Sequence, residues 1–195
     1  MRHSSPIVRV SLIAVLAGLC GALAAAQTTQ EPFKPMEFRG RWFTGAGGSM
    51  DAVLTVRIDV TGFTTTDEVV RLSDAINARG ESGFREVFRS FKKGVIRVIG
   101  GTGLNIEFHA AKEVSKDKST EIHLIAENAV FQPGSSRAPG QGLFFLVIVL
   151  ELDAKGNGEG KVYENSTIKF TPNGELELDE FKTAPKLIGG LRRTK

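Results

Sequence analysis

The chain has 195 residues, 41% of them hydrophobic, and its 25 Lys and Arg residues nearly balance its 22 Asp and Glu residues. This balance argues against nucleic acid as a partner, because phosphate contacts require a markedly basic protein surface. The single cysteine, Cys20, excludes a framework of disulfides within the chain.

Residues 1–26 have the pattern of a secretory signal peptide. Arg2 and Arg9 provide a positive start, and an apolar stretch from residue 10 ends in three alanines at 24–26. This stretch is too short for a good membrane-spanning helix. We therefore expect a bacterial protein that is exported, as a periplasmic or secreted domain. Cleavage would remove Cys20 and two positive charges, which would leave a nearly neutral chain without cysteine.

The mature chain is expected to begin with a short lead-in and a strand. Residues 27–37 are polar, contain two prolines and predict a flexible lead-in. Residues 38–195 are expected to form a single domain, because no later linker is long or biased enough to divide them. Within this domain, residues 51–60 alternate between apolar and polar side chains, which predicts a half-buried strand.

Two helices are predicted next. Thr65 and Glu68 form a capping-box pattern, from which apolar residues continue at helical spacing until Gly80. A stripe of phenylalanines predicts a second helix at about 82–93, which Gly94 would end.

After Gly94 the apolar pattern changes to the two-residue period of strands. Turn signals separate the strands, so neighbouring strands should pair antiparallel. The stretch at 143–150 is apolar on both faces, which predicts a central strand covered on both sides, one of them by the helices. The predicted strands span 95–99, 104–111, 121–131, 143–152, 161–170 and 175–182.

These elements predict an α+β fold. We expect a curved, mainly antiparallel sheet of seven or eight strands, with a two-helix insertion after the second strand. A glycine-rich turn at 153–158 should join two of the strands. It resembles a calcium loop in part, but Lys155 stands where a ligand would be needed.

Two histidines form the most interesting set of chemically active side chains. If the strands at 104–111 and 121–131 pair as a hairpin, His109 and His123 share its polar face with Glu107 and Glu121. Imidazole and carboxylate groups at cross-strand distance could bind zinc or act as an acid–base pair. The alternative is an ordinary solvated sheet face, and no metal-site spacing motif accompanies the pair.

Basic residues line the predicted second helix opposite its phenylalanines. Such a cationic amphipathic helix can lie on an anionic membrane surface. Alternatively, it packs through its apolar stripe and leaves the basic side in water. The residues concerned are Arg85, Arg89, Lys92 and Lys93.

The segments 51–59 (DAVLTVRID), 65–68 (TTDE) and 152–160 (LDAKGNGEG) resemble a group of uncharacterised exported bacterial proteins. The resemblance spans most of the mature chain, and its motifs are a strand, a helix cap and a hairpin. It implies the architecture alone and carries no activity or catalytic residues.

Three functions remain open from the sequence. The first is a non-enzymatic binding or interaction module, whose 13 phenylalanines would line a site for an apolar small molecule or fill the core. The second is a metal-binding protein or metal-assisted enzyme that uses His109 and His123. The third is a structural protein of the cell envelope, which would dock on an envelope protein or membrane surface. No catalytic residue and no organic cofactor is assigned.

Overall fold

The computed structural model describes residues 33–45, 52–100, 103–127, 145–170, 176–178 and 184–195. They belong to one compact unit, Phe33–Lys195. The expected leader lies in a second unit, Met1–Pro32, outside the described residues.

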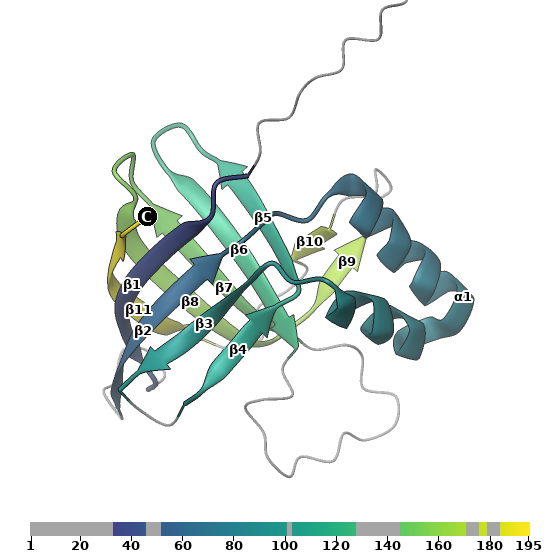
Figure 1. Ribbon diagram of the computed structural model, residues 1–195, viewed down its shortest axis with the longest axis horizontal. Helices are drawn as coiled ribbons and strands as arrows, with labels where there is room; N and C mark the ends of the chain where they lie inside the picture. The colour runs from purple at the N-terminus through teal and green to yellow at the C-terminus, as the bar shows by residue number, and fades with distance from the viewer. Residues whose placement is uncertain (1–32, 46–51, 101–102, 128–144, 171–175, 179–183) are drawn as a thin grey trace, which may run out of the picture. The chain divides into compact units, whose positions relative to one another are not determined.

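Nine strands form one antiparallel sheet in the order β4-β3-β2-β1-β11-β8-β7-β6-β5 (Figure 1). Strands β9, Ile168–Phe170, and β10, Leu176–Leu178, pair in a separate small sheet. The nine strands are β1, Met36–Phe43; β2, Val53–Val60; β3, Gly94–Ile99; β4, Asn105–Phe108; β5, Ala110–Ser115; β6, Thr120–Glu127; β7, Phe145–Leu152; β8, Asn157–Ser166; and β11, Lys186–Arg193.

The sheet curves until its two edges nearly meet. The edge strands β4 and β5 are separated in the chain by His109 alone. On one side of this residue, the Lys93 amide donates to the Phe108 carbonyl at 2.8 Å, next to β3. On the other side, the His109 amide donates to the Ile125 carbonyl of β6 at 2.9 Å. One continuous strand predicted at 104–111 is therefore wrong, because the chain changes its pairing partner at His109.

The curved sheet has apolar residues on both of its faces. The inner face is filled by one large core, because alternate residues of most strands point inward. On the outer face, α1 packs against β5, β6 and β7 to form a second core. Residues of β7 belong to both cores, which confirms the prediction that the strand at 143–152 is covered on both faces. Residues 143–144 of that predicted strand lie outside the described residues. The inner core includes Phe38, Trp42, Ile58, Ile96, Phe108, Leu124, Ile148, Leu150 and Ile188, and the outer core includes Leu72, Phe84, Phe88, Ile125, Phe145 and Val147.

One helical element, α1, Thr66–Ser90, occupies the place predicted for two helices. Thr65 and Glu68 form the predicted capping box. Gly80 has φ 64° and ψ −151°, so the helix bends there instead of ending, and Figure 1 shows two helical arms. Among the described residues, no helix has the length and apolar character needed to cross a bilayer.

The predicted fold class was therefore wrong in its number of strands and in its number of helices. Among the described residues, the main sheet has nine strands instead of seven or eight, and one bent helix follows β2 instead of a pair. The extra strands have two sources: the strand predicted at 104–111 divides at His109 into β4 and β5, and β11 lies beyond the last predicted strand. The strand predicted at 161–170 also divides, near Asn165 with φ 59°, but its second part, β9, belongs to the separate small sheet. β1 begins at Met36, inside the predicted lead-in, while most of the strand predicted at 175–182 lies outside the described residues.

Candidate anion-binding surface

Four arginines stand in cross-strand register on the outer face of four neighbouring strands. Arg97 of β3 is opposite Arg57 of β2, and Arg57 is opposite Arg39 of β1. Arg39 is in turn opposite Arg192 of β11. Their chain neighbours, such as Ile58, point into the inner core, so the arginines must face outward. We call these four residues the arginine row.

An acidic pair borders the arginine row on one side. Glu37 and Asp59 are opposite each other, two residues along β1 and β2 from the arginines. Arg57 bonds both carboxylates at 2.9 Å, Arg39 contacts Glu37 at 3.1 Å, and Arg97 contacts Asp59. The acidic pair therefore holds three members of the row in place.

The guanidinium groups remain more accessible than the carboxylates that hold them. The side chains of Arg39, Arg57 and Arg97 are 40 to 56% exposed, whereas those of Glu37 and Asp59 are 15 and 16% exposed. A hydrogen bond from Thr194 and the nearby arginines keep the pKa of Glu37 below its ordinary value, although desolvation opposes them. The hydrogen bond to Asp59 raises the pKa of Arg57. Both groups are charged at neutral pH.

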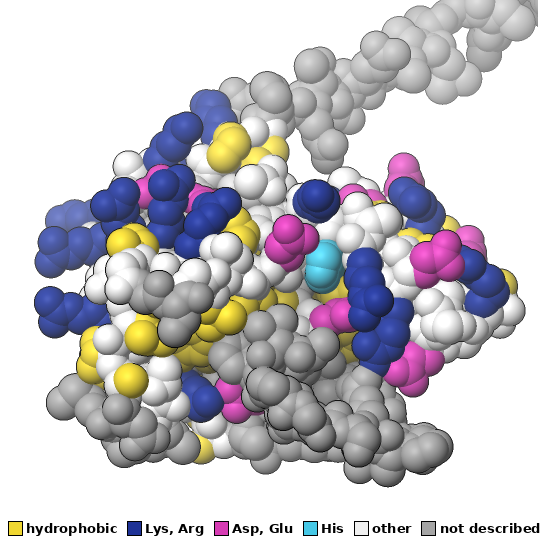
Figure 2. All heavy atoms as spheres, turned by 60° about the horizontal axis from the view of Figure 1, so that its bottom comes forward, with side chains coloured by type: hydrophobic (Ala, Val, Ile, Leu, Met, Phe, Trp, Pro, Cys, Tyr) yellow, Lys and Arg dark blue, Asp and Glu magenta, His cyan; other side chains and the backbone are white. Residues whose placement is uncertain are grey.

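A fifth arginine and several apolar residues lie on the other side of the arginine row. Arg41, Thr55 and Ile99 form the next cross-strand row, and Phe43, Val53 and Leu187 form the row after it. Figure 2 shows Lys and Arg side chains gathered at the left of the molecule, where Figure 1 places β1, β2 and β11, with hydrophobic side chains exposed beside them. This face therefore changes from acidic to basic to apolar along the strands.

The sequence contains a weak signal for the arginine row. Arginines occupy outward positions of the alternating segments around Arg39, Arg57 and Arg97, where polar residues of any kind satisfy the pattern. The register that aligns them comes from pairing between segments far apart in the chain. The alternating pattern alone therefore does not reveal this surface.

The residues predicted to bind a metal are found in different surroundings. His109 Nδ1 contacts the Phe91 carbonyl at 2.8 Å, and its ring packs edge-on against buried Phe88. Glu107 lies on β4 in a hollow of about 280 Å³, which Lys92 and Arg97 also line. In the part of the chain that the structure describes, no group of three or more His, Cys, Asp or Glu side chains could hold a metal ion.

Of the predicted set, the structure brings His123 and Glu121 together. His123 Nε2 lies 3.2 Å from one carboxylate oxygen of Glu121, and Lys116 contacts the other. Burial raises the pKa of Glu121, but the bonds to Lys116 and His123 outweigh it and bring the pKa below its ordinary value. A zinc site shared by His109 and His123 stays a prediction. Zinc titration of the wild type against His109→Ala and His123→Ala would test it, since equal affinities would exclude a shared site.

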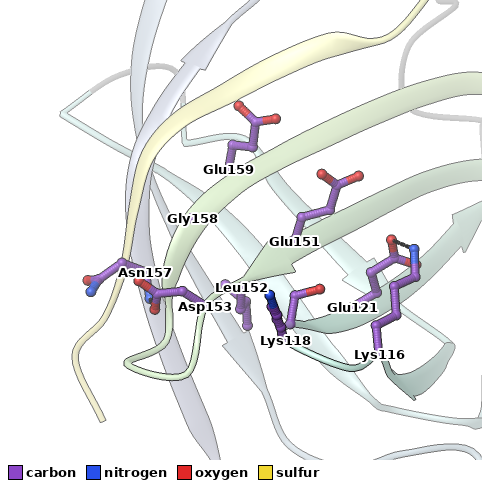
Figure 3. Close-up of a pocket in the computed structure, with 10 residues that line it drawn as sticks. Lys116, Lys118, Glu121, Glu151, Leu152, Asp153, Asn157, Gly158 and Glu159 are labelled. Carbon is purple, nitrogen blue, oxygen red and sulfur yellow. Dashed lines mark hydrogen bonds and ion pairs between the residues drawn. The ribbon is translucent and has the colours of Figure 1, made fainter.

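Glu121 also lines a larger hollow of about 630 Å³ at the end of two hairpins (Figure 3). Here Glu121, Glu151 and Glu159 are in cross-strand register on β6, β7 and β8. Lys161 bonds Glu151 at 2.5 Å, so neighbouring lysines engage two of the three carboxylates. The mixed charges make this hollow a weaker candidate site than the arginine row.

The loop at 153–158 is a hairpin turn, as predicted. The Asp153 side chain accepts hydrogen bonds from the backbone amides of Lys155 and Asn157 at 2.8 and 2.9 Å. Those bonds, the one from Asn157 first, lower the pKa of Asp153. Its carboxylate therefore stabilises the turn itself.

The basic residues predicted for the second helix are largely engaged with carboxylates. Arg85 and Arg89 both contact Glu127 of β6, at 3.4 and 2.7 Å. Lys93 is buried and bonds Glu68 at 2.7 Å. These pairs attach α1 to the sheet and join its first turn to the segment that follows it, so much of this positive charge is compensated.

A scan against protein-family models, a search of curated proteins and a search of solved structures each return no match for this chain.

Proposed function

We propose that this protein is an exported, non-enzymatic binding module that holds an anionic ligand on the arginine row. The observation that carries the proposal is the register of four arginines on neighbouring strands. Like charges directly opposite each other destabilise a sheet, and two carboxylates compensate only part of this charge. A ligand with several negative charges would compensate the remaining positive charge.

The chemistry of arginine supports binding rather than catalysis. The guanidinium group stays protonated and presents a planar fork of donors that matches phosphate, sulfate or carboxylate oxygens. It is therefore suited to hold an anion and poorly suited to move a proton. The accessible groups are cationic, so we favour an anionic ligand over the apolar one expected from the phenylalanine content.

The spacing of the arginine row indicates the size of the ligand. Neighbouring strands lie about 4.8 Å apart, so four arginines span roughly 14 Å. A single small anion would reach one or two of them. A polymer or a surface with repeated negative groups could contact all four at once.

The test is the binding of fluorescently labelled polyphosphate, measured by anisotropy at several salt concentrations. The variant Arg39→Gln/Arg97→Gln/Arg192→Gln keeps Arg57, which binds both Glu37 and Asp59. We expect it to lose at least tenfold in affinity at low salt, and the slope of log K against log salt to fall by about 2, since each contact contributes about 0.7.

The matched control removes three positive charges elsewhere, with Arg79→Gln/Lys118→Gln/Lys155→Gln. All three side chains belong to exposed residues outside the arginine row. We expect this control to stay within about threefold of the wild type. Equal losses in the two variants would mean that net charge alone drives binding, and the proposal would then be wrong. Absence of binding by the wild type would also contradict it.

A further inference from the structure

The arginine row is bordered by exposed apolar side chains on the side away from Glu37 and Asp59. Val53 and Ile99 are each 45% exposed, although both belong to strands of the sheet. Phe43 is opposite Val53 and packs over Gly189, where a Cβ would lie 3.0 Å from the Phe43 ring. We call Phe43, Val53, Ile99 and Leu187 the apolar border; Phe43 and Leu187 are half-buried.

The order of the rows defines a direction along the strands. Two residues along a strand span about 6.7 Å, so Ile99 lies about 7 Å from the arginine row and Val53 about 13 Å. The acidic pair lies on the opposite side, two residues from the row. Arg41 shares the level of Ile99, so a ligand that contacts both the arginines and the apolar border must be anionic near the first two rows and apolar at the level of Phe43 and Val53, about 13 Å from the arginine row.

We propose that this face docks on the surface of an anionic phospholipid bilayer. The arginine row binds the lipid phosphates, and the apolar border enters the boundary between the headgroups and the acyl chains. Interfacial amphipathic helices bury their apolar face about 5–10 Å into this boundary, a depth comparable to the roughly 7 Å between the level of Ile99 and the level of Val53. Glu37 and Asp59 then point away from the bilayer, where they do not repel anionic headgroups.

This inference rests on the proposed function and adds the identity of the ligand. A dissolved polyanion, such as an acidic polysaccharide or a nucleic acid, would use the arginine row but would gain little from Val53 and Ile99. The apolar border therefore favours lipid over these polymers. A membrane contact was predicted for the helical segment that contains Arg85 and Arg89, but both of these arginines contact Glu127. The face of the sheet has exposed guanidinium groups, so we place the membrane contact there.

Vesicle flotation tests the inference with two lipid compositions. One is phosphatidylcholine alone, and the other contains about one-third phosphatidylglycerol, so that it carries a negative surface potential. We expect the wild type to bind the anionic vesicles at least tenfold more tightly than the neutral ones, and to be released as salt shortens the Debye length. Equal binding to both vesicles, or no binding to either, would overturn the inference.

Two variants separate lipid docking from anion binding in general. Val53→Ser/Ile99→Ser removes exposed apolar groups without changing the charge, and we expect it to lose about tenfold in vesicle affinity while polyphosphate binding is unchanged. Val70→Ser is the matched control, since Val70 of α1 is also exposed and lies outside the apolar border, and it should bind vesicles like the wild type. Unchanged polyphosphate binding also shows that the serine variant is folded.

The outcomes distinguish the two proposals. If Val53→Ser/Ile99→Ser binds anionic vesicles like the wild type, the lipid inference is wrong and the anion-binding function stands. The same holds if the wild type binds polyphosphate but not vesicles. If the wild type binds neither probe, both proposals fail.

Discussion

Glu68 in the first turn of α1 forms an ion pair with Lys93, which lies three residues beyond the end of the helix. Replacing Glu68 by glutamine should destabilise the fold. A straight helix of 25 residues would be roughly 37 Å long. Lys93 Nζ nevertheless lies 2.7 Å from a carboxylate oxygen of Glu68, because the helix bends at Gly80 and returns. The same carboxylate accepts a hydrogen bond from the Thr65 amide at 2.8 Å.

The expected cost follows from the burial of this pair. The side chains of Lys93 and Glu68 are 10 and 20% exposed, so Glu68→Gln leaves a nearly buried ammonium without its counter-charge. Breaking a fully buried pair costs about 3–5 kcal/mol, and a hydrogen bond to a charged group contributes about 1.5–3 kcal/mol. Because the pair retains some exposure, we expect the free energy of unfolding to fall by about 2–3 kcal/mol.

The assay is urea unfolding followed by the fluorescence of Trp42, which is the only tryptophan and is buried. With a slope of about 2 kcal/mol per M, the midpoint should fall by about 1 M. The double variant Glu68→Gln/Lys93→Met should recover part of the loss, because no charge is left unpaired. The control is Arg79→Gln, which breaks an exposed ion pair and should cost less than about 1 kcal/mol. The reasoning is refuted if Glu68→Gln costs no more than this control.

The effect should also depend on pH in a defined direction. Burial raises the pKa of Glu68, but the hydrogen bonds from Lys93 and Thr65 prevail, so the folded-state pKa lies below the ordinary value of 4.5. The carboxylate therefore contributes its stability above about pH 4.5, and this contribution is lost as the pH falls through the lowered pKa. We expect the difference between the wild type and Glu68→Gln to be full at pH 7 and to shrink below pH 4.5. A difference that is constant across this range would contradict the assigned cause.

Two further predictions concern the helix and its packing. Gly80→Ala should lower the free energy of unfolding by about 1–3 kcal/mol, because Gly80 has φ +64°, a conformation that strains residues with a side chain. An added Cβ would meet no atom within 4 Å, so backbone strain alone would cause the loss. The control Gly62→Ala should change the free energy of unfolding by less than about 0.5 kcal/mol. Equal urea midpoints for these two variants would exclude strain at the bend. Phe88→Ala should cost about 3–5 kcal/mol, because the side chain is fully buried against Phe84 and Phe145, while Val70→Ala should be nearly neutral in the same assay. A small loss for Phe88→Ala would mean that α1 does not form a cooperative unit with the sheet.

The elements that depend on neighbouring residues could be predicted from the sequence. The strand at 51–60 follows from strict alternation and is observed as β2. The capping box depends on residues three apart, and the turn after Asp153 depends on residues two and four apart. In each case the stabilising contact lies within a few residues, so the local pattern contains the information.

The strand count and the helix bend depended on more than local pattern. The segment at 104–111 alternates as one strand, yet it divides at His109 because its two halves pair with β3 and β6. Gly80 has the signature of a helix end, but the helix bends there and both of its arms, with Leu72 on one and Phe88 on the other, pack into the core on the outer face of the sheet. In both cases a partner far along the chain decided the outcome.

The candidate site also combines features set by the local sequence with features set by pairing between distant segments. Alternation in the sequence is enough to place Arg39, Arg57 and Arg97 on the outward side of their strands. The register between four strands places these arginines opposite one another. It also places Arg192 beside them and exposed Val53 at their border. Side-chain direction is set by the local backbone period, whereas register is set by backbone pairing and core packing across the whole sheet. The sequence by itself therefore determined which way the charges face, and only the tertiary structure decided which charges meet.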